Sequence, residues 1–236
     1  MLKTSRFSFI GTAITLALVA ACSSEAKNEP PKNDSPSNDS PLLHPTAEML
    51  SERAPDTVRV RFETSKGPFV VEAYRDWAPN GVDRFYQLAR AGFYDGDRFF
   101  RVLTGFMAQF GLHGDPKVTS VWHERSIPDD PVKHSNARGT ITFAARGAPN
   151  SRTTQLFINY RDNANLDGMG FSPFGVVTEG MAAVDSLYAA YGEGAPDGPG
   201  PDQERASSQG NAYLQRDFPK LDYITKATVL TPPRPK

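Results

Sequence analysis

Residues 99–111 read FFRVLTGFMAQFG and indicate two short strands, Phe99–Leu103 and Phe106–Gln109. Aromatic and apolar side chains fill both runs, and such side chains favour the pleated, half-buried surface of a strand. Successive residues of a strand point to opposite faces, so Met107 and Gln109, two positions apart, share one face. The segment therefore predicts sheet structure that carries an apolar and an amide side chain next to each other.

Strand signals of the same kind recur along the rest of the chain. Apolar residues alternate with charged ones at 58–62, and further short runs lie at 69–73, 140–144, 155–160, 174–177 and 224–230. Only two segments have the helical period: one begins after Pro79 and stops at Gly92, and the other fits Met181–Tyr191. We expect surface loops at 111–139 and 192–210. Many short strands with two helices predict a mainly β protein with a closed or sandwiched antiparallel sheet.

The composition excludes several classes of protein. A hydrophobic share of 39%, before glycine is counted, supports a sizeable core and excludes a wholly disordered chain. Lys and Arg number 26 against 27 Asp and Glu, with no long basic run, so nucleic acid is not an expected partner. The single cysteine excludes an internal disulfide. The histidines lack the spacing of a zinc site, so we expect no metal and no cofactor.

The first residues are typical of a bacterial export signal. Lys3 and Arg6 precede the apolar run Phe7–Ala21, which as a helix would cover only about 22 Å of a hydrocarbon core of about 30 Å. A basic start and a short apolar run predict a signal peptide over 1–21. The run LVAAC at Leu18–Cys22 resembles the lipobox of bacterial lipoproteins, in which the cysteine, here Cys22, is acylated. The alternative is an ordinary secretory signal with an incidental cysteine.

Residues 22–56 are expected to hold the lipidated cysteine and a disordered tether. The part over 23–41 has no large apolar side chain and cannot bury enough surface to offset its ordering entropy. The part over 42–56 is also compatible with a short docking segment, because it contains several leucines and a methionine. The folded domain is then predicted over 57–236.

Three blocks of the chain together resemble the cyclophilin-type peptidyl-prolyl cis-trans isomerases. Residues 99–111 are similar to the F-H-R-x-x-x-G-F-[MV]-x-Q-x-G block of that family, 139–144 with 154–159 to its second block, and 166–168 with 174–177 to its third. The blocks occur in the family's order, and the likeness covers roughly 57–230. It implies a closed eight-stranded antiparallel β-barrel capped by two α-helices.

The resemblance also implies a catalytic residue, Arg101. A fixed guanidinium that hydrogen-bonds to the prolyl nitrogen or the adjacent carbonyl favours the twisted amide over both planar states, and it needs no nucleophile, metal or cofactor. The substrate-binding residues that the resemblance implies are Phe106, Met107, Phe157 and Leu166 around the proline ring, Gln109 and Gln155 beside the arginine, Ala144 for the residue before proline, and Phe171 at the other wall. Taken alone, these residue types are more often core or solvent-facing.

The chain departs from the family pattern at three positions in or next to this set of residues. Phe100 stands where a histidine is usual before the arginine, Asn165 stands where an aromatic residue precedes Leu166, and Phe171 falls about where a histidine is typical. We expect catalysis to survive these changes and the specificity of the rim to differ.

The sequence therefore predicts a peptidyl-prolyl cis-trans isomerase that accelerates X–Pro rotation in exported proteins by electrostatic stabilisation of the twisted amide. The expected partners are proline-containing polypeptides and, through the lipid anchor, a membrane. The domain is expected to be a monomer in the bacterial cell envelope, in the periplasm or on the extracellular face. The alternative is a non-catalytic, membrane-tethered proline-peptide binding module or chaperone, which would not need the arginine.

Overall fold

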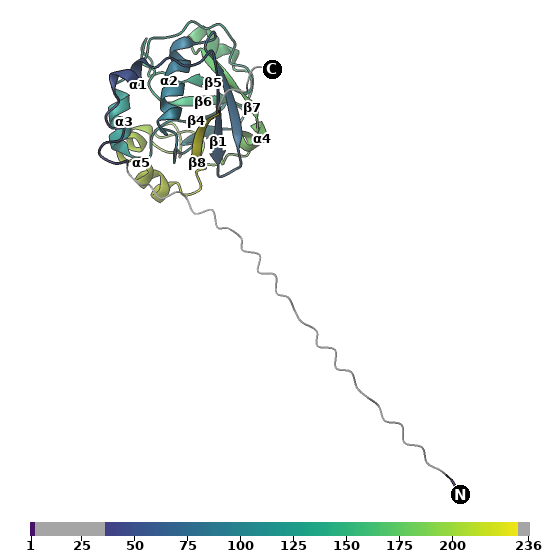
Figure 1. The fold of residues 1–236 in the computed structure, drawn as a ribbon. Helices are drawn as coiled ribbons and strands as arrows, with labels where there is room; N and C mark the ends of the chain where they lie inside the picture. Colours follow the sequence, from purple (N-terminus) through teal and green to yellow (C-terminus); the bar gives the residue numbers. More distant parts are fainter. Residues whose placement is uncertain (3–35, 231–236) are drawn as a thin grey trace.

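Eight strands form one antiparallel sheet in the computed structural model, which describes residues 1–2 and 36–230 (Figure 1). They are β1 (Thr57–Thr64), β2 (Phe69–Tyr74), β3 (Arg101–Leu103), β4 (Met107–Phe110), β5 (Thr140–Phe143), β6 (Leu156–Asn159), β7 (Pro173–Glu179) and β8 (Ile224–Leu230). Their order across the sheet is β3-β4-β6-β5-β7-β2-β1-β8. The mainly β, eight-stranded antiparallel architecture predicted from the sequence is confirmed.

The sheet is an open, curled half-barrel, so the predicted closure of the barrel is not confirmed. Its two edges, β3 and β8, share no ladder of strand pairs. The segments just ahead of them do meet, because Arg98 and Tyr223 form a single bridge and the N–H of Ile224 donates to the carbonyl of Asp97 at 2.8 Å. These contacts stop before β3 begins. β3 has only three residues and pairs with β4 along one side, and its other side forms no ladder with β8.

Helices pack on the sheet and along its edges. Within the described residues they are α1 (Ala47–Ser51), α2 (Pro79–Arg90), α3 (Pro116–His123), the 3₁₀-helix η1 (Ala164–Met169), α4 (Met181–Asp185) and α5 (Gln203–Asp217). The helix predicted after Pro79 is confirmed as α2. Proline occupies the start of this helix, where its missing N–H costs nothing, and Val82, Phe85 and Leu88 bury its apolar face.

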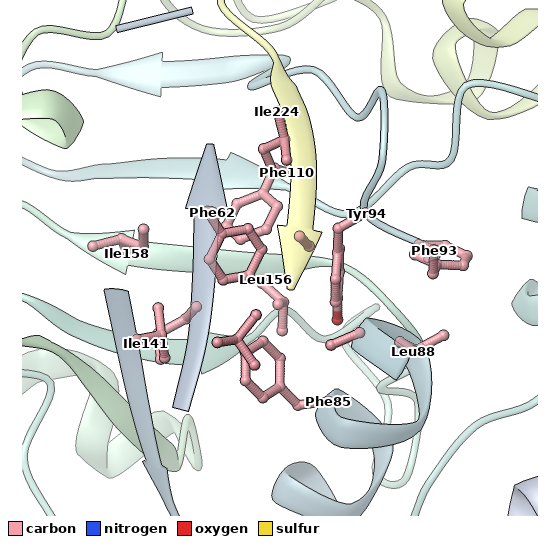
Figure 2. Close-up of a cluster of buried hydrophobic side chains, with 14 of the residues drawn as sticks. Phe62, Phe85, Leu88, Phe93, Tyr94, Phe110, Ile141, Leu156, Ile158 and Ile224 are labelled. Atoms are coloured by element: carbon pink, nitrogen blue, oxygen red, sulfur yellow. The ribbon is translucent and has the colours of Figure 1, made fainter. Parts of the chain in front are cut away.

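The core between the sheet and α2 is aromatic. Phe62 of β1 stacks on Phe69 of β2 with ring centroids 4.9 Å apart, and its ring also lies 6.2 Å from Phe85, 5.9 Å from Tyr94 and 6.0 Å from Phe110. Figure 2 shows the side chains of α2, β1, β4 and the segment after α2 gathered around Phe62. Burying one such side chain contributes about 2–3 kcal/mol, so this cluster holds α2 against the sheet.

The second predicted helix, over 181–191, is wrong in length. α4 has only five residues, because the chain leaves the helix soon after it begins. The N–H of Tyr188 donates to Oδ2 of Asp222 at 2.6 Å, and the rings of Tyr188 and Tyr191 lie 5.0 Å apart in an edge contact. Of the apolar residues that suggested a helix, Val184 and Leu187 are buried in the main core, while Tyr188 and Tyr191 pair with each other beyond the helix.

Two further helices lie where the sequence predicted surface loops. α3 falls within 111–139, and α5 begins within 192–210 and packs on α3. α5 is interrupted at Gly210, whose φ of 59° lies in the left-handed region. Its Tyr213 packs with Phe100 in a second buried apolar cluster. The period of this helix was hidden because a glycine breaks it and a Gly- and Pro-rich run precedes it.

The N-terminal segment 42–56 packs on the domain, so the folded part begins ahead of Thr57. Leu42 is 5% exposed, and its carbonyl accepts a hydrogen bond from Nε1 of the buried Trp122 at 3.0 Å. The side chain of Gln87 on α2 donates to the carbonyls of Leu50 and Glu52, at 3.1 and 2.9 Å. Residues 42–56 therefore form a docking segment and not a disordered tether.

Apart from residues 1–2, the predicted signal peptide, Cys22 and the tether up to residue 35 lie outside the described residues. Within the described part, no helix is long and apolar enough to cross a membrane.

A fragment that begins at Thr57 should be less stable than one that begins at residue 36. Removing the docking segment uncovers Trp122 and loses the burial of Leu42, which together should cost about 2 kcal/mol or more. Thermal unfolding should then show a melting temperature lower by about 4–8 °C. Leu42→Ala in the longer fragment should reproduce part of the loss. Equal melting temperatures for the two fragments would contradict a stabilising role of the segment.

Candidate active site

Three neighbouring strands bring site residues into one row. Arg101 of β3 lies opposite Gln109 of β4, and Gln109 lies opposite Phe157 of β6. Directly paired residues of adjacent strands share a face, so the three side chains point the same way. The intervening residues Val102 and Ala108 point into the core and are 4% and 0% exposed. The strand alternation predicted from the sequence therefore separates core from site.

The row lies in a surface groove with a volume of about 780 Å³. The groove brings together every site residue predicted for the described part of the chain. These residues are Arg101, Phe106, Met107, Gln109, Ala144, Gln155, Phe157, Leu166 and Phe171.

One part of the groove is an apolar pocket. Met107, Phe157 and Leu166 form a small cluster of their own, at 2%, 6% and 7% exposed, and Phe106 and Phe171 pack against it. The rings of Phe157 and Phe171 meet edge to face, with centroids 5.8 Å apart. An open pocket with aromatic walls fits a compact apolar ring such as that of proline.

A chain of hydrogen bonds places a cation beside this pocket. Nη1 of Arg101 donates to Oε1 of Gln109 at 3.1 Å, and Nε2 of Gln109 donates to Oε1 of Gln155 at 2.8 Å. Gln109 is only 5% exposed, so its orientation is fixed by these partners. The groove can therefore hold an apolar ring and offer hydrogen bonds from a guanidinium to the adjoining peptide.

Comparisons with known proteins agree with this geometry. A profile of the family described as cyclophilin type peptidyl-prolyl cis-trans isomerase/CLD matches residues 59–204. Peptidyl-prolyl cis-trans isomerase B of Escherichia coli K12 is 30% identical over 185 residues, which cover 73% of this chain and 99% of that protein. A peptidyl-prolyl cis-trans isomerase of Helicobacter pylori is 32% identical over 146 residues, 60% of this chain and 87% of its own.

The chain belongs to the cyclophilin-type peptidyl-prolyl cis-trans isomerase family. It is a peptidyl-prolyl cis-trans isomerase, an enzyme that interconverts the two planar forms of X–Pro bonds. A crystal structure of a cyclophilin type isomerase from Cryptosporidium parvum has the same fold, with a TM-score of 0.55 and 21% identity over 75% of this chain and 99% of that one.

The wall of the isomerase pocket rests on a buried asparagine that the sequence did not single out. Nδ2 of Asn136 donates to Oδ1 of Asp167 and to the carbonyl of Phe171, each at 2.8 Å, and its Oδ1 accepts from the hydroxyl of Thr142 at 2.9 Å. Asp167 follows Leu166 in η1, so these bonds hold both pocket residues in place. An asparagine in a long loop has no distinctive spacing, and only its contacts identify it.

The charge on Asp167 is part of this support. Partial removal from water acts to raise its pKa, but the hydrogen bonds from Ser135 and Asn136 outweigh this and hold the pKa of Asp167 below its usual value. The carboxylate therefore stays ionised, and accepts strong hydrogen bonds, throughout the neutral range.

Glu193 is a second site residue that the sequence did not indicate. Its two carboxylate oxygens accept hydrogen bonds from Nε and Nη2 of Arg101, at 2.5 and 2.6 Å. These bonds, together with one from the N–H of Gly194, lower the pKa of Glu193. The residue lies in the segment predicted to be a surface loop, so no pattern connected it with the site.

The remaining site features are structural or electrostatic. Phe100 is 1% exposed and packs under α5, so the phenylalanine in place of the family's usual histidine belongs to the second apolar cluster.

Two further residues, His123 and Arg146, also line the groove. Asn165 is exposed and does not line it. Among the described residues, no group of three or more His, Cys, Asp or Glu side chains is placed to hold a metal ion.

Replacing Asp167 by alanine should weaken the pocket wall while leaving Arg101 intact. Loss of charged hydrogen bonds should lower the free energy of unfolding by about 2 kcal/mol. KM for a proline peptide should rise several-fold, with a smaller change in kcat. Because the folded pKa of Asp167 is lowered, the stability difference should be full at neutral pH and shrink as pH falls below about 4.

Asp185→Ala is the matched control, since Asp185 pairs with Arg138 at 2.8 Å outside the groove. Denaturant unfolding and a protease-coupled assay measure both effects. An unchanged KM in the Asp167 variant would show that η1 does not depend on this carboxylate.

Proposed function

We propose that this isomerase is a lipid-anchored enzyme of the bacterial cell envelope that acts on exported proteins, with Arg101 as its catalytic residue. The observation that carries the catalytic part is the guanidinium of Arg101 held beside an apolar pocket by Gln109. The run LVAAC at Leu18–Cys22 supports the anchor.

Rotation about an X–Pro bond breaks amide resonance against a barrier of about 18–20 kcal/mol. As the bond twists, the prolyl nitrogen recovers a lone pair that the planar amide lacks. A hydrogen-bond donor aimed at that nitrogen or at the adjacent carbonyl stabilises the twisted state more than either planar state, and each tenfold gain in rate needs about 1.4 kcal/mol of such preference. Arginine suits this role because its charge does not depend on pH in the physiological range.

The groove divides the work among its residues. Phe106, Met107, Phe157 and Leu166, with Phe171 at the far wall, take the proline ring. Gln109 orients the arginine, Gln155 orients Gln109 or the peptide, and Ala144 lines the part that takes the residue before proline. Because no bond is broken, this mechanism needs only positioned donors and an apolar seat. The binding partners are proline-containing segments of polypeptides, and the domain acts as a monomer.

A non-catalytic binding module that uses the same pocket is the second interpretation. It requires only the apolar residues. The row of Arg101 and Gln109 beside the pocket favours the enzyme, because a cation fixed at that place adds nothing to holding a proline ring.

The anchor places the enzyme near its clients. Acylation of Cys22 would attach the chain to a membrane, and the residues over 23–41 would act as a flexible tether with a reach on the order of 25 Å. The docking segment that starts at Leu42 then joins the tether to the domain, where the carbonyl of Leu42 accepts the hydrogen bond from Trp122.

Arg101→Ala should lower kcat/KM for a proline peptide by at least about a hundredfold, which corresponds to about 2.7 kcal/mol of transition-state stabilisation. The melting temperature should hardly change, because partly exposed charges contribute little to folding. Arg61→Ala is the control, since Arg61 pairs with Glu63 on β1 outside the groove. A protease-coupled proline-peptide assay measures the rates. Turnover near the parent rate in the Arg101 variant would refute the catalytic assignment.

Cys22→Ser should release the protein from the membrane into the soluble fraction, or leave the signal uncleaved, because the acyl chains have no other attachment point. Labelling with a radioactive or clickable fatty acid during growth should mark the parent protein and not the variant. An unlabelled parent protein would leave an ordinary secreted enzyme and remove the anchor from the proposal.

A further inference from the structure

We propose that Glu193 is a positioning residue that aims the guanidinium of Arg101 at the substrate. The inference rests on the proposed catalytic role of Arg101 and goes beyond it, because it assigns a function to the segment between α4 and α5. Glu193 is the carboxylate that binds Arg101, and both side chains line the same groove.

The carboxylate binds one edge of the guanidinium. Its two oxygens accept from Nε and Nη2 of Arg101 at 2.5 and 2.6 Å, which is the paired geometry that Arg forms best with a carboxylate. Two parallel bonds fix the plane of the group as well as its position. A single hydrogen bond would leave the guanidinium free to rotate about that bond.

The other edge of the guanidinium faces the pocket. Nη1 donates to Gln109 and lies 4.0 Å from the sulfur of Met107, and the Arg101 head lies 6.0 Å from the ring centre of Phe106. Met107 and Phe106 belong to the apolar pocket. Glu193 and a bound proline peptide therefore use different edges of Arg101. A residue that supports Arg101 binds the edge of the guanidinium that faces away from the pocket. A residue that competes with the substrate would bind the edge that faces the pocket.

The segment that carries Glu193 folds closely around the backbone of that residue. The carbonyl of Glu193 accepts a hydrogen bond from the N–H of Gly200 at 2.7 Å, and the N–H of Gly194 donates to Oε1 of the Glu193 side chain at 2.8 Å. A Cβ added at Gly198 would lie 2.4 Å from the carbonyl oxygen of Glu193 and 2.8 Å from its Cβ. The turn closes tightly enough on Glu193 that only glycine fits there, so the carboxylate starts from a fixed point.

The Arg101–Glu193 pair contributes by ordering the arginine side chain and not by stabilising the fold. The side chain of Arg101 is 21% exposed and that of Glu193 is 35% exposed, so water screens their attraction and the pair adds little to folding. An unheld arginine side chain has many rotamers and loses that freedom when it binds. Glu193 and Gln109 remove that freedom in advance, and a donor that is already in place costs no reorganisation when the bond twists.

The test compares Glu193→Ala and Glu193→Gln with the parent enzyme. The alanine variant should lose about tenfold in kcat/KM, through kcat and with KM nearly constant, because the pocket that binds proline is untouched. The glutamine variant should recover part of the loss, since its amide oxygen still accepts one of the two bonds. Glu179→Gln is the matched control, because Glu179 pairs with Arg59 at 2.5 Å outside the groove. Equal or higher activity of Glu193→Ala would overturn the inference.

A second readout does not depend on activity. In ¹H–¹⁵N spectra, the Nε–H of Arg101 should appear shifted and slow to exchange in the parent enzyme, and should return to the position of a solvated arginine in Glu193→Ala. An unchanged signal would also overturn the inference. If Arg101→Ala retains full turnover, the catalytic proposal fails first. If Arg101→Ala is inactive and Glu193→Ala is fully active, only the role of Glu193 fails.

Discussion

The register of β4 between β3 and β6 is the constraint on which the site depends. It sets Arg101, Gln109 and Phe157 in one row, and it sends the residues between them into the core. Side chains alternate along a strand, so a slip of one residue in β4 would bury Gln109 among the core aromatics and turn Phe110 outward. The core therefore enforces the site. Phe110 lies 5.2 Å from Phe99 and 6.0 Å from Phe62, ring centre to ring centre, and these contacts lock the register.

The features that alternate or repeat locally could be predicted from the sequence. The strand alternation at 58–62 and the helical period after Pro79 are properties of neighbouring residues, and both describe the structure. The nine groove residues came from the family resemblance, eight of them from its blocks and Phe171 from between two runs of the third, since no local pattern distinguishes Met107 or Phe157 from ordinary core. What escaped prediction depends on contacts between distant segments. Trp122 binds the carbonyl of Leu42 across 80 positions, and Glu193 meets Arg101 across 92.

The segment between α4 and α5, together with α5 itself, contacts the start of β3 from two sides. α5 buries Tyr213 and Leu214 beside Phe100 and Leu112, so apolar side chains cover the edge of the half-barrel next to β3. Phe100 is the residue next to Arg101 and points away from the groove into that cover. The segment between α4 and α5 supplies Glu193 on the groove side. The stretch from the end of α4 through α5 thus packs behind the short strand that carries the arginine and also holds the arginine's head group in front.

A counter-charge next to the proposed catalytic cation is compatible with this reaction because the reaction creates no net charge. Twisting the amide moves electron density from the carbonyl toward the nitrogen of the same peptide, and the proline segment stays neutral throughout. The transition state therefore needs a donor with the right direction more than it needs a strong positive potential. Pairing with Glu193 lowers the positive electrostatic potential of the guanidinium but keeps the direction of its N–H donors, since its Nη1 edge still faces the pocket. The pairing also leaves the groove less attractive to free anions, which would otherwise compete with a neutral peptide for an isolated cation. Neither histidine nor lysine would serve as well at this place, because the charge of histidine changes near neutral pH and lysine lacks the planar edges that let one face bind a carboxylate while the other faces substrate.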